Sequence, residues 1–203
     1  MLWWRSVGYS HTAFVVESFL DEVAHAAGKD PYEFRARCWV PNTRAYGGVL
    51  ELAAQQAGWG TPLPPGRARG IAAHESFGKW VAEGSLANGR PRVHRVVCAI
   101  DCGQYVTRHH PGADGERHRV RALGRAPRRD HPQGGRVQQS NFHDYSVLRM
   151  NEMPLVGVRI VESREKPGGV GEPGVPPVAP ATGNALFALT GKRIRRLPVQ
   201  AET

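Results

Sequence analysis

Glu172 is the side chain whose surroundings best suit chemistry. It lies in the segment GGVGEPG, residues 168–174. Glycines on both sides let the backbone approach a ligand closely, and Pro173 fixes the direction of the chain. A carboxylate held in such a loop could act as a positioned general base. The competing interpretation is an ordinary exposed glutamate in a turn, and general physical grounds alone favour it.

Other residue types give weaker signals. Arg5, in the segment WRSVG, could clamp an anion with its planar guanidinium, although a single arginine is more often a surface charge. Two pairs resemble acid–base pairs, but adjacent residues on a strand point to opposite faces. These pairs are His74-Glu75 and His143-Asp144. GGVGEPG matches neither a dinucleotide fingerprint nor a phosphate-binding loop.

The three cysteines do not form a recognisable site. They are too few for a disulfide scaffold and lack the paired spacing of a zinc site, so no metal ligands are expected. We expect each to be a buried small apolar residue. They are Cys38, Cys98 and Cys102.

Residues 1–60 are predicted to form a helical segment. Residues 12–27 are typical of an amphipathic helix with an apolar stripe toward a core, followed by Gly28 as a stop. The stripe comprises Val16, Phe19, Leu20, Val23 and Ala27, opposite Glu17, Asp21 and Glu22. Asp30, Pro31 and Glu33 then form a capping box for a second helix. A third is expected over residues 48–57, with Leu50, Ala53, Ala54 and Ala57 on one side.

Residues 61–106 are predicted to be rich in β-structure. The stretches 70–82 and 92–101 flank Asn88-Gly89, a tight-turn dipeptide. The C-terminal segment, 136–203, is predicted to be mixed: a strand over 155–161, the glycine- and proline-rich loop around Glu172, and a helix over 181–190. Gly191 ends that helix.

The composition first suggests an anionic partner. The chain has 203 residues and a formal net charge of +9. No run of 18 apolar residues is present, so no membrane span is expected. Residues 108–136 hold eight arginines against three acidic residues, a net charge of +5. Because no aromatic residue lies between Tyr105 and Phe142, residues 107–135 are predicted to be disordered. A basic nucleic-acid-binding protein is therefore one alternative function.

Five separated blocks resemble a known family. They resemble, in order, the C-terminal part of the molybdopterin-binding large subunit of xanthine dehydrogenase/aldehyde oxidase-type molybdenum hydroxylases. The best match is the branch that contains the β-subunit of isoquinoline 1-oxidoreductase. The blocks begin WWRSVGYSHTAF, GRARGIAAHESFG, RVHRVVCAIDCG, RVQQSNFHDYSV and GGVGEPGVPPVA. They cover residues 2 to about 106 and 136 to 198.

The resemblance implies roles for four residues. Glu172 matches the family's catalytic glutamate, the base that deprotonates a hydroxyl on molybdenum. Arg5 and Gly171 match positions at the cofactor. Val7 matches a substrate-pocket position that is aromatic in the xanthine-oxidising branch, and this departure leaves the substrate open. The implied cofactor is molybdopterin, expected as the cytosine dinucleotide, and the implied partners are an iron–sulfur small subunit and a cytochrome subunit.

The basic stretch departs from the family. Permitted codons for RHHPGADGE, residues 108–116, give DTIRAQME when they are read one base out of frame. Continued to residue 133, the shifted frame gives the sequence SGIVFGLSAALHGEITLK, which the family has at this place. We therefore expect residues 108 to about 133 to be translated out of frame, which removes a glutamine that holds the pterin in the family. A nonfunctional pseudogene product is thus a further alternative.

The combined expectation is an incomplete α+β molybdopterin-binding domain. The chain would be a fragment of the catalytic subunit of a hydroxylase that oxidises an aldehyde or N-heteroaromatic compound with water as the oxygen source. Without the N-terminal half of the same subunit, we expect it not to retain molybdopterin and to be inactive alone. Exposed apolar surface is expected where that half would pack. The cytoplasm is the default compartment, with the periplasm as the alternative for the intact subunit.

Overall fold

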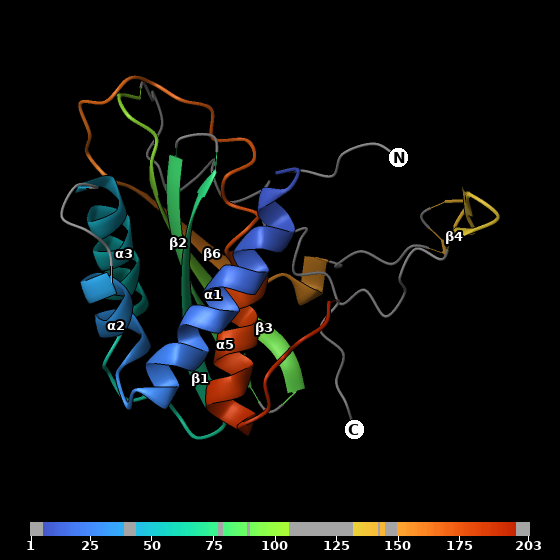
Figure 1. The fold of residues 1–203 in the computed structure, drawn as a ribbon, viewed down its shortest axis with the longest axis horizontal. Coiled ribbons are helices and arrows are strands. Elements are labelled where there is room, and N and C mark those ends of the chain that lie inside the picture. Colours follow the sequence, from blue (N-terminus) through green and yellow to red (C-terminus); the bar gives the residue numbers. More distant parts are fainter. Residues whose placement is uncertain are drawn as a thin grey trace.

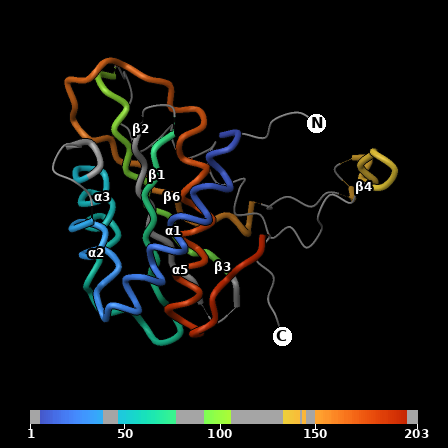
Figure 2. The backbone as a smooth tube through the Cα atoms, viewed as in Figure 1, coloured from blue at the N-terminus to red at the C-terminus, as the bar shows by residue number. Residues whose placement is uncertain are grey.

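The computed structural model describes residues 6–38, 44–76, 79–88, 90–105, 132–141, 143–144 and 150–197. These residues form a mixture of helix and strand compatible with the expected α+β class (Figures 1 and 2). The predicted disordered, frame-shifted stretch 107–135 lies outside them except for residues 132–135. Pro132–Gln133 (β4) and Arg136–Val137 (β5) pair as a small antiparallel hairpin.

A four-stranded sheet organises the chain in the order β1-β2-β3-β6. Its strands are Arg67–Ser76 (β1), Lys79–Asn88 (β2), Arg90–Asp101 (β3) and Leu155–Ile160 (β6). The first three pair antiparallel, and β6 pairs parallel with β3. The predicted single stretch over 70–82 is wrong because it joins two strands. Ser76 pairs antiparallel with Lys79, so β1 and β2 are separate strands, and the predicted pairing of strands on either side of Asn88-Gly89 is confirmed.

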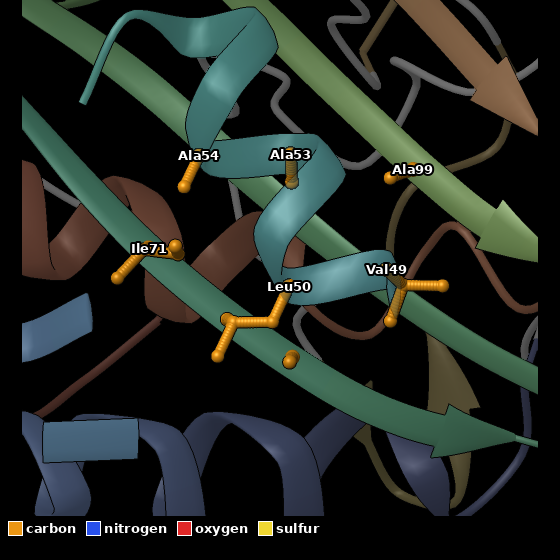
Figure 3. Packing of buried hydrophobic residues seen from close by; sticks show 7 residues of the cluster. Val49, Leu50, Ala53, Ala54, Ile71 and Ala99 are labelled. Atoms are coloured by element: carbon orange, nitrogen blue, oxygen red, sulfur yellow. The ribbon is translucent and has the colours of Figure 1, made fainter. Parts of the chain in front are cut away.

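Helices lie on both faces of this sheet. Helix α3 (Arg44–Ala57) packs on one face, where Leu50 and Ala53 meet Ile71 and Ala99 (Figure 3). Helix α5 (Val178–Thr190) crosses the other face at Gly70, where an added Cβ would overlap its backbone. Neighbouring residues on a strand point to opposite faces, so Gly70 faces α5 and Ile71 faces α3. Helix α1 (Tyr9–Ala26) lies beside α5 (Figure 1).

Sequence signals at helix ends are confirmed. Helix α2 (Pro31–Cys38) begins where the carboxylate of Asp30 accepts bonds from the amides of Tyr32 and Glu33, at 2.8 and 3.0 Å. Gly191 ends α5 with a φ of 70°. The buried face predicted for α3 is also confirmed. Of the cysteines, Cys98 and Cys102 are buried as expected, but Cys38 is exposed, so its expected burial is wrong.

Helix α1 is oriented opposite to its sequence pattern. The helix itself is confirmed, yet Glu17 and Asp21 are buried, while Val16 and Phe19 of the predicted core stripe are 48% and 62% exposed. Val15 is 64% exposed beside them. In this orientation the carboxylates of Glu17 and Asp21 are paired with the guanidinium groups of Arg35 and Arg193, so neither is buried as an unpaired charge. We call Val15, Val16 and Phe19 the outer apolar face of α1.

Candidate functional site

The structure brings the loop of Glu172 against the turn that begins α1. The Ser6 hydroxyl donates to the backbone carbonyl of Glu172 at 2.6 Å. The Ser6 amide donates to the carboxylate oxygen Oε1 of Glu172 at 3.3 Å. These residues are 166 positions apart in the sequence. Two of the predicted blocks, WRSVG and GVGEP, therefore meet at one place.

Backbone strain is concentrated at the same turn. Ser6 and Val7 have φ values of +66° and +50°, and they are the non-glycine residues with positive φ in the described part of the chain. This conformation is rare for a β-branched residue, and such outliers gather at functional sites. Tyr9 donates its amide to the Ser6 carbonyl at 2.9 Å and closes the turn. The strained backbone is what directs the Ser6 amide toward Glu172.

The end of β3 anchors the other side of the Glu172 loop. The amide of Gln104 donates to the Glu165 carbonyl at 2.9 Å, and the amide of Gly168 donates to the Cys102 carbonyl at 3.0 Å. Gly103, with a φ of +71°, lies against this loop, and an added Cβ would overlap the carbonyl oxygen of Lys166. Glycine is therefore required at this position, both for its φ and for the close approach.

The glycines of the loop leave room near Glu172. An added Cβ at Gly169 or Gly171 would meet no heavy atom within 4 Å. Glu172 itself is half-buried, and Pro173 after it is buried. Val7 is 38% exposed. Of the four predicted site residues, the structure thus joins the segments of Val7, Gly171 and Glu172, whereas Arg5 lies outside the described residues.

The other acid–base candidates do not join this site as pairs. His74 is half-buried and Glu75 is exposed, consistent with opposite faces of β1. Asp144 instead caps a local turn: its carboxylate accepts bonds from the amides of Ser140 and Asn141, which lowers its pKa to about 2. Within the residues that the structure describes, no three His, Cys, Asp or Glu side chains gather as a metal-ion site.

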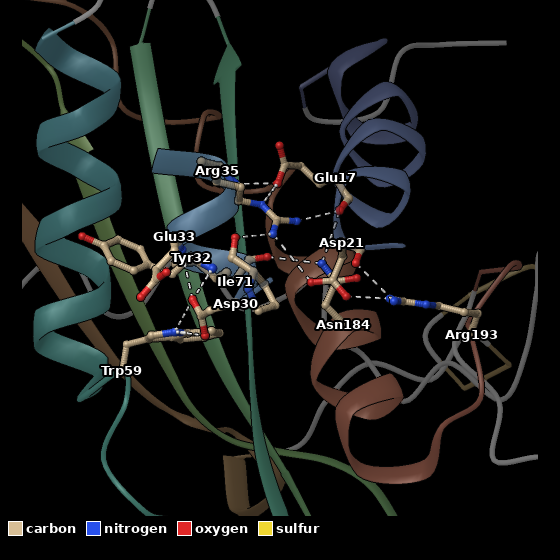
Figure 4. Close-up of polar contacts among 12 residues, drawn as sticks. Glu17, Asp21, Asp30, Tyr32, Glu33, Arg35, Trp59, Ile71, Asn184 and Arg193 are labelled. Atoms are coloured by element: carbon tan, nitrogen blue, oxygen red, sulfur yellow. Dashed lines mark hydrogen bonds and ion pairs between the residues drawn. The ribbon is translucent and has the colours of Figure 1, made fainter. Parts of the chain in front are cut away.

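A buried ionic network fixes α1 behind the site (Figure 4). The Arg35 guanidinium donates to the Glu17 carboxylate at 2.9 Å and to the Glu17 backbone carbonyl at 2.8 Å. The Ala73 amide of β1 donates to the same carboxylate at 3.2 Å. Burial raises the pKa of Glu17, and the positive charge of Arg35 opposes this rise.

The network continues to the C-terminal side of the chain. Arg193 donates to the Asp21 carboxylate at 2.6 Å and lies over the Phe187 ring. The Asn184 side-chain amide of α5 donates to the Ile71 carbonyl of β1 at 3.2 Å. Helices α1, α2 and α5 are thereby held on β1, so the turn that begins α1 has a fixed position.

Sequence reasoning missed Ser6 and this network. Ser6 stood inside a recognised block, but nothing in its type distinguished it from other surface serines. The spacing of Glu17 and Asp21, four residues apart, places both on one helical face. That spacing is equally typical of a solvated face, and only the opposing arginines show that it is buried.

Replacement of Val7 by glycine is expected to stabilise the chain by about 1 kcal/mol, because glycine adopts a positive φ without steric cost. Chemical denaturation measures the change. Val170→Gly is the matched control, since Val170 has the same 38% exposure and no positive φ. That control is expected to lose about 0.5–1 kcal/mol. Equal changes in both variants would show that Val7 carries no strain.

The chain is similar in sequence to known proteins over nearly its whole length. The chain is 31% identical over 98% of its length to a membrane-bound aldehyde dehydrogenase (pyrroloquinoline-quinone) of Gluconacetobacter polyoxogenes. It is 31% identical over 97% of its length to the beta subunit of isoquinoline 1-oxidoreductase of Brevundimonas diminuta. It is 30% identical over 98% of its length to the B subunit of nicotinate dehydrogenase of Pseudomonas putida. No family model matches the chain.

All three relatives are named as oxidoreductases or as subunits of oxidoreductases. More specifically, the chain is homologous to part of the large subunits of molybdenum hydroxylases, which confirms the resemblance read from the sequence. It spans 29%, 26% and 19% of the lengths of these three relatives. The relatives do not favour the nucleic-acid-binding alternative. Among the helices described, none combines the length and apolar character of a membrane span.

Proposed function

We propose that the chain is a segment of the catalytic subunit of a molybdenum hydroxylase that oxidises an aldehyde or an N-heteroaromatic compound, with water as the oxygen source. The observation that carries the proposal is the contact of Ser6 with Glu172. It unites two distant blocks that both resemble the family's active-site motifs. The printed names of the relatives, an aldehyde dehydrogenase, an isoquinoline oxidoreductase and a nicotinate dehydrogenase, support these two substrate classes.

In this proposal Glu172 is the general base. The Ser6 amide binds one carboxylate oxygen and so orients the carboxylate, while the Ser6 hydroxyl holds the backbone of the same residue. A base in a fixed position can take a proton without first paying for its own ordering. Val7, partly exposed on the same turn, would face the substrate, and Arg5 and Gly171 would contact the cofactor.

We propose that the loop around Glu172 lies against an extended organic cofactor. Gly169 and Gly171 leave open space where side chains would otherwise project, so a flat ligand can lie against their backbone. When bound, molybdopterin carries the metal that accepts two electrons from the substrate. The name of the Gluconacetobacter relative gives pyrroloquinoline quinone instead. Cofactor analysis therefore needs to test for both groups, and the dinucleotide form of the pterin stays a proposal.

The remaining polypeptide of the large subunit is proposed as a partner. The chain spans less than a third of each relative, and the outer apolar face of α1 is exposed on the opposite side from the ionic network. An amphipathic helix normally buries such a stripe. The N-terminal half of the subunit would cover it, and an iron–sulfur subunit and a cytochrome subunit would complete the electron path. We therefore propose that this chain does not hold molybdenum and is inactive alone.

A chimera tests the proposed base. This chain, with the Brevundimonas sequence kept in place of residues 108–133, would replace its matched segment in the Brevundimonas protein, which would be produced with its native partner subunits and assayed with isoquinoline. Glu172→Gln is expected to lower kcat at least 100-fold, the usual contribution of a general base. Glu165→Gln is the control, because Glu165 is an exposed glutamate of the same loop. Equal activity of the two variants would contradict the assignment.

The isolated chain is the companion sample in this experiment. Elemental analysis is expected to find no stoichiometric molybdenum in it, and a redox-cycling stain is expected to find no quinone. One molybdenum per isolated chain would overturn the proposal that the segment cannot hold the cofactor alone. An inactive chimera that nevertheless holds molybdenum would count against this chain as a source of the catalytic machinery.

The out-of-frame origin of residues 108 to about 133 is also a proposal. It would account for four of the nine net positive charges without an anionic ligand. The DNA of the locus decides it: the second reading frame either encodes the family's sequence or does not. If it does, restoring the frame would return a glutamine for the pterin, and the pseudogene alternative would describe the present gene.

A further inference from the structure

His74 on β1 is a half-buried side chain that the proposed mechanism does not use. Its ring meets the Tyr9 ring edge-on, with the centroids 5.8 Å apart and the planes at 66°. Its Nε2 atom is buried and has no hydrogen-bond partner. Burial also lowers the pKa of His74, which disfavours the charged imidazolium form. An unpaired buried nitrogen is costly and calls for an explanation.

Tyr9 connects His74 to the site. Its amide donates to the carbonyl of Ser6 at 2.9 Å, which closes the strained turn at the start of α1. Ser6 then holds both the carboxylate and the backbone of Glu172. Each step from His74 through Tyr9 and Ser6 to Glu172 is thus a direct contact. A displacement of the Tyr9 ring would move the turn that orients the carboxylate.

The contact needs an aromatic ring rather than a hydrogen bond. The edge-on arrangement of His74 and Tyr9 is the geometry that aromatic pairs prefer. The strain at Ser6 and Val7 means that the turn requires support from its surroundings to persist. Tyr9 is 37% exposed, so the turn is supported through the side of the Tyr9 ring that faces the sheet. His74 is the residue of β1 that faces it there.

We propose that His74 is a positioning residue for Glu172, acting through Tyr9 and the Ser6 turn. The inference rests on the proposed role of Glu172 as the base. It concerns the order of the Glu172 loop, which is measurable on the isolated chain without any cofactor. Its failure is therefore distinguishable from failure of the proposed function, which the chimera measures through activity.

Amide hydrogen exchange of the full chain, followed residue by residue by NMR, tests the proposal. The reporters are the amides of Ser6 and Val175, which donate to the Glu172 carboxylate and carbonyl. His74→Ala is expected to accelerate their exchange roughly three- to tenfold, the effect of losing one aromatic pair. The Ala27 amide, at the far end of α1, is expected to keep its rate. His74→Phe retains a ring and is expected to restore slow exchange at both reporters.

A matched control separates positioning from general destabilisation. His94 on β3 also has a buried Nε2 without a partner. His94→Ala is expected to leave the Ser6 and Val175 rates unchanged. Tyr9→Ala removes the other ring of the pair, which is partly exposed. It is expected to accelerate exchange at Ser6 and Val175 as much as His74→Ala does, and the double variant is expected to show no further acceleration.

The proposal is overturned by any of three results. The reporters could keep their rates in both His74→Ala and Tyr9→Ala, they could respond equally to His94→Ala, or His74→Phe could behave as His74→Ala. Should His74→Ala not fold, Tyr9→Ala and His74→Phe decide the question. Acceleration at Ser6 and Val175 in Tyr9→Ala, together with slow exchange in His74→Phe, would support the proposal.

Discussion

Arg35→Ala is expected to lower the free energy of unfolding by about 3–5 kcal/mol, the cost of leaving a buried charge without its partner. Arg35 and Glu17 are 0% and 1% exposed, so the substitution removes the buried cationic partner of the Glu17 carboxylate. The substitution also removes the bonds that Arg35 donates to the Glu17 and Pro31 carbonyls. Equilibrium denaturation with urea measures the loss.

Two further variants identify the cause. Arg37→Ala on the same helix removes an exposed arginine and is expected to change stability by less than about 0.5 kcal/mol. The double variant Glu17→Met with Arg35→Met removes both charges and fills their volume, and it is expected to regain most of the loss. If the double variant is as unstable as Arg35→Ala, the unpaired charge of Glu17 is not the cause of the loss.

Gly70→Ala is the second change with a large expected effect, a loss of about 1–3 kcal/mol or more. The new Cβ would overlap the Ala181 carbonyl oxygen and the Ala185 amide nitrogen and would lie 3.0 Å from the Ala185 Cα. These are backbone atoms of α5, so a side-chain rotation cannot relieve the overlap. Helix α5 would have to move away from β1, and the Glu172 loop that leads into it would move as well.

Gly157→Ala provides the control for Gly70→Ala. Gly157 also lies inside a strand, β6, but an added Cβ there would meet nothing within 4 Å. This variant is expected to gain about 0.5–1 kcal/mol from the lower entropy of the unfolded chain. Thermal unfolding of the two variants compares them directly. Similar stability in both would show that α5 does not press on β1 at Gly70.

Local signals predicted much of the fold. Asp30 with Glu33, the buried alanines of α3 and Gly191 each act within one turn of helix, so the residues themselves determine the outcome. The orientation of α1 was not predictable in this way. Glu17 is buried because Arg35 of α2 and Ala73 of β1 donate hydrogen bonds to its carboxylate. The sequence pattern does not show that these residues lie next to Glu17.

The candidate site was also predictable only in part. Glu172 stood out through its glycine and proline neighbours, and the family resemblance supplied its proposed role. The contact that orients it comes from Ser6, 166 residues earlier, and depends on a backbone conformation that residue type does not predict. Neither periodicity nor local propensity predicts tertiary contacts between distant segments of the chain.

The parallel pairing of β3 with β6 has a consequence for the stretch that we propose to be out of frame. The connection between these strands contains residues 108 to about 133, and a parallel pair requires only that its connection be long enough to cross over. The entropy lost on closing a loop depends on the number of residues in it and only weakly on their identity. A frame shift that is later compensated replaces residues while nearly conserving their number. The topology would therefore let the sheet and the Glu172 loop survive the proposed frame shift, whereas the same change within a core strand would destroy that strand.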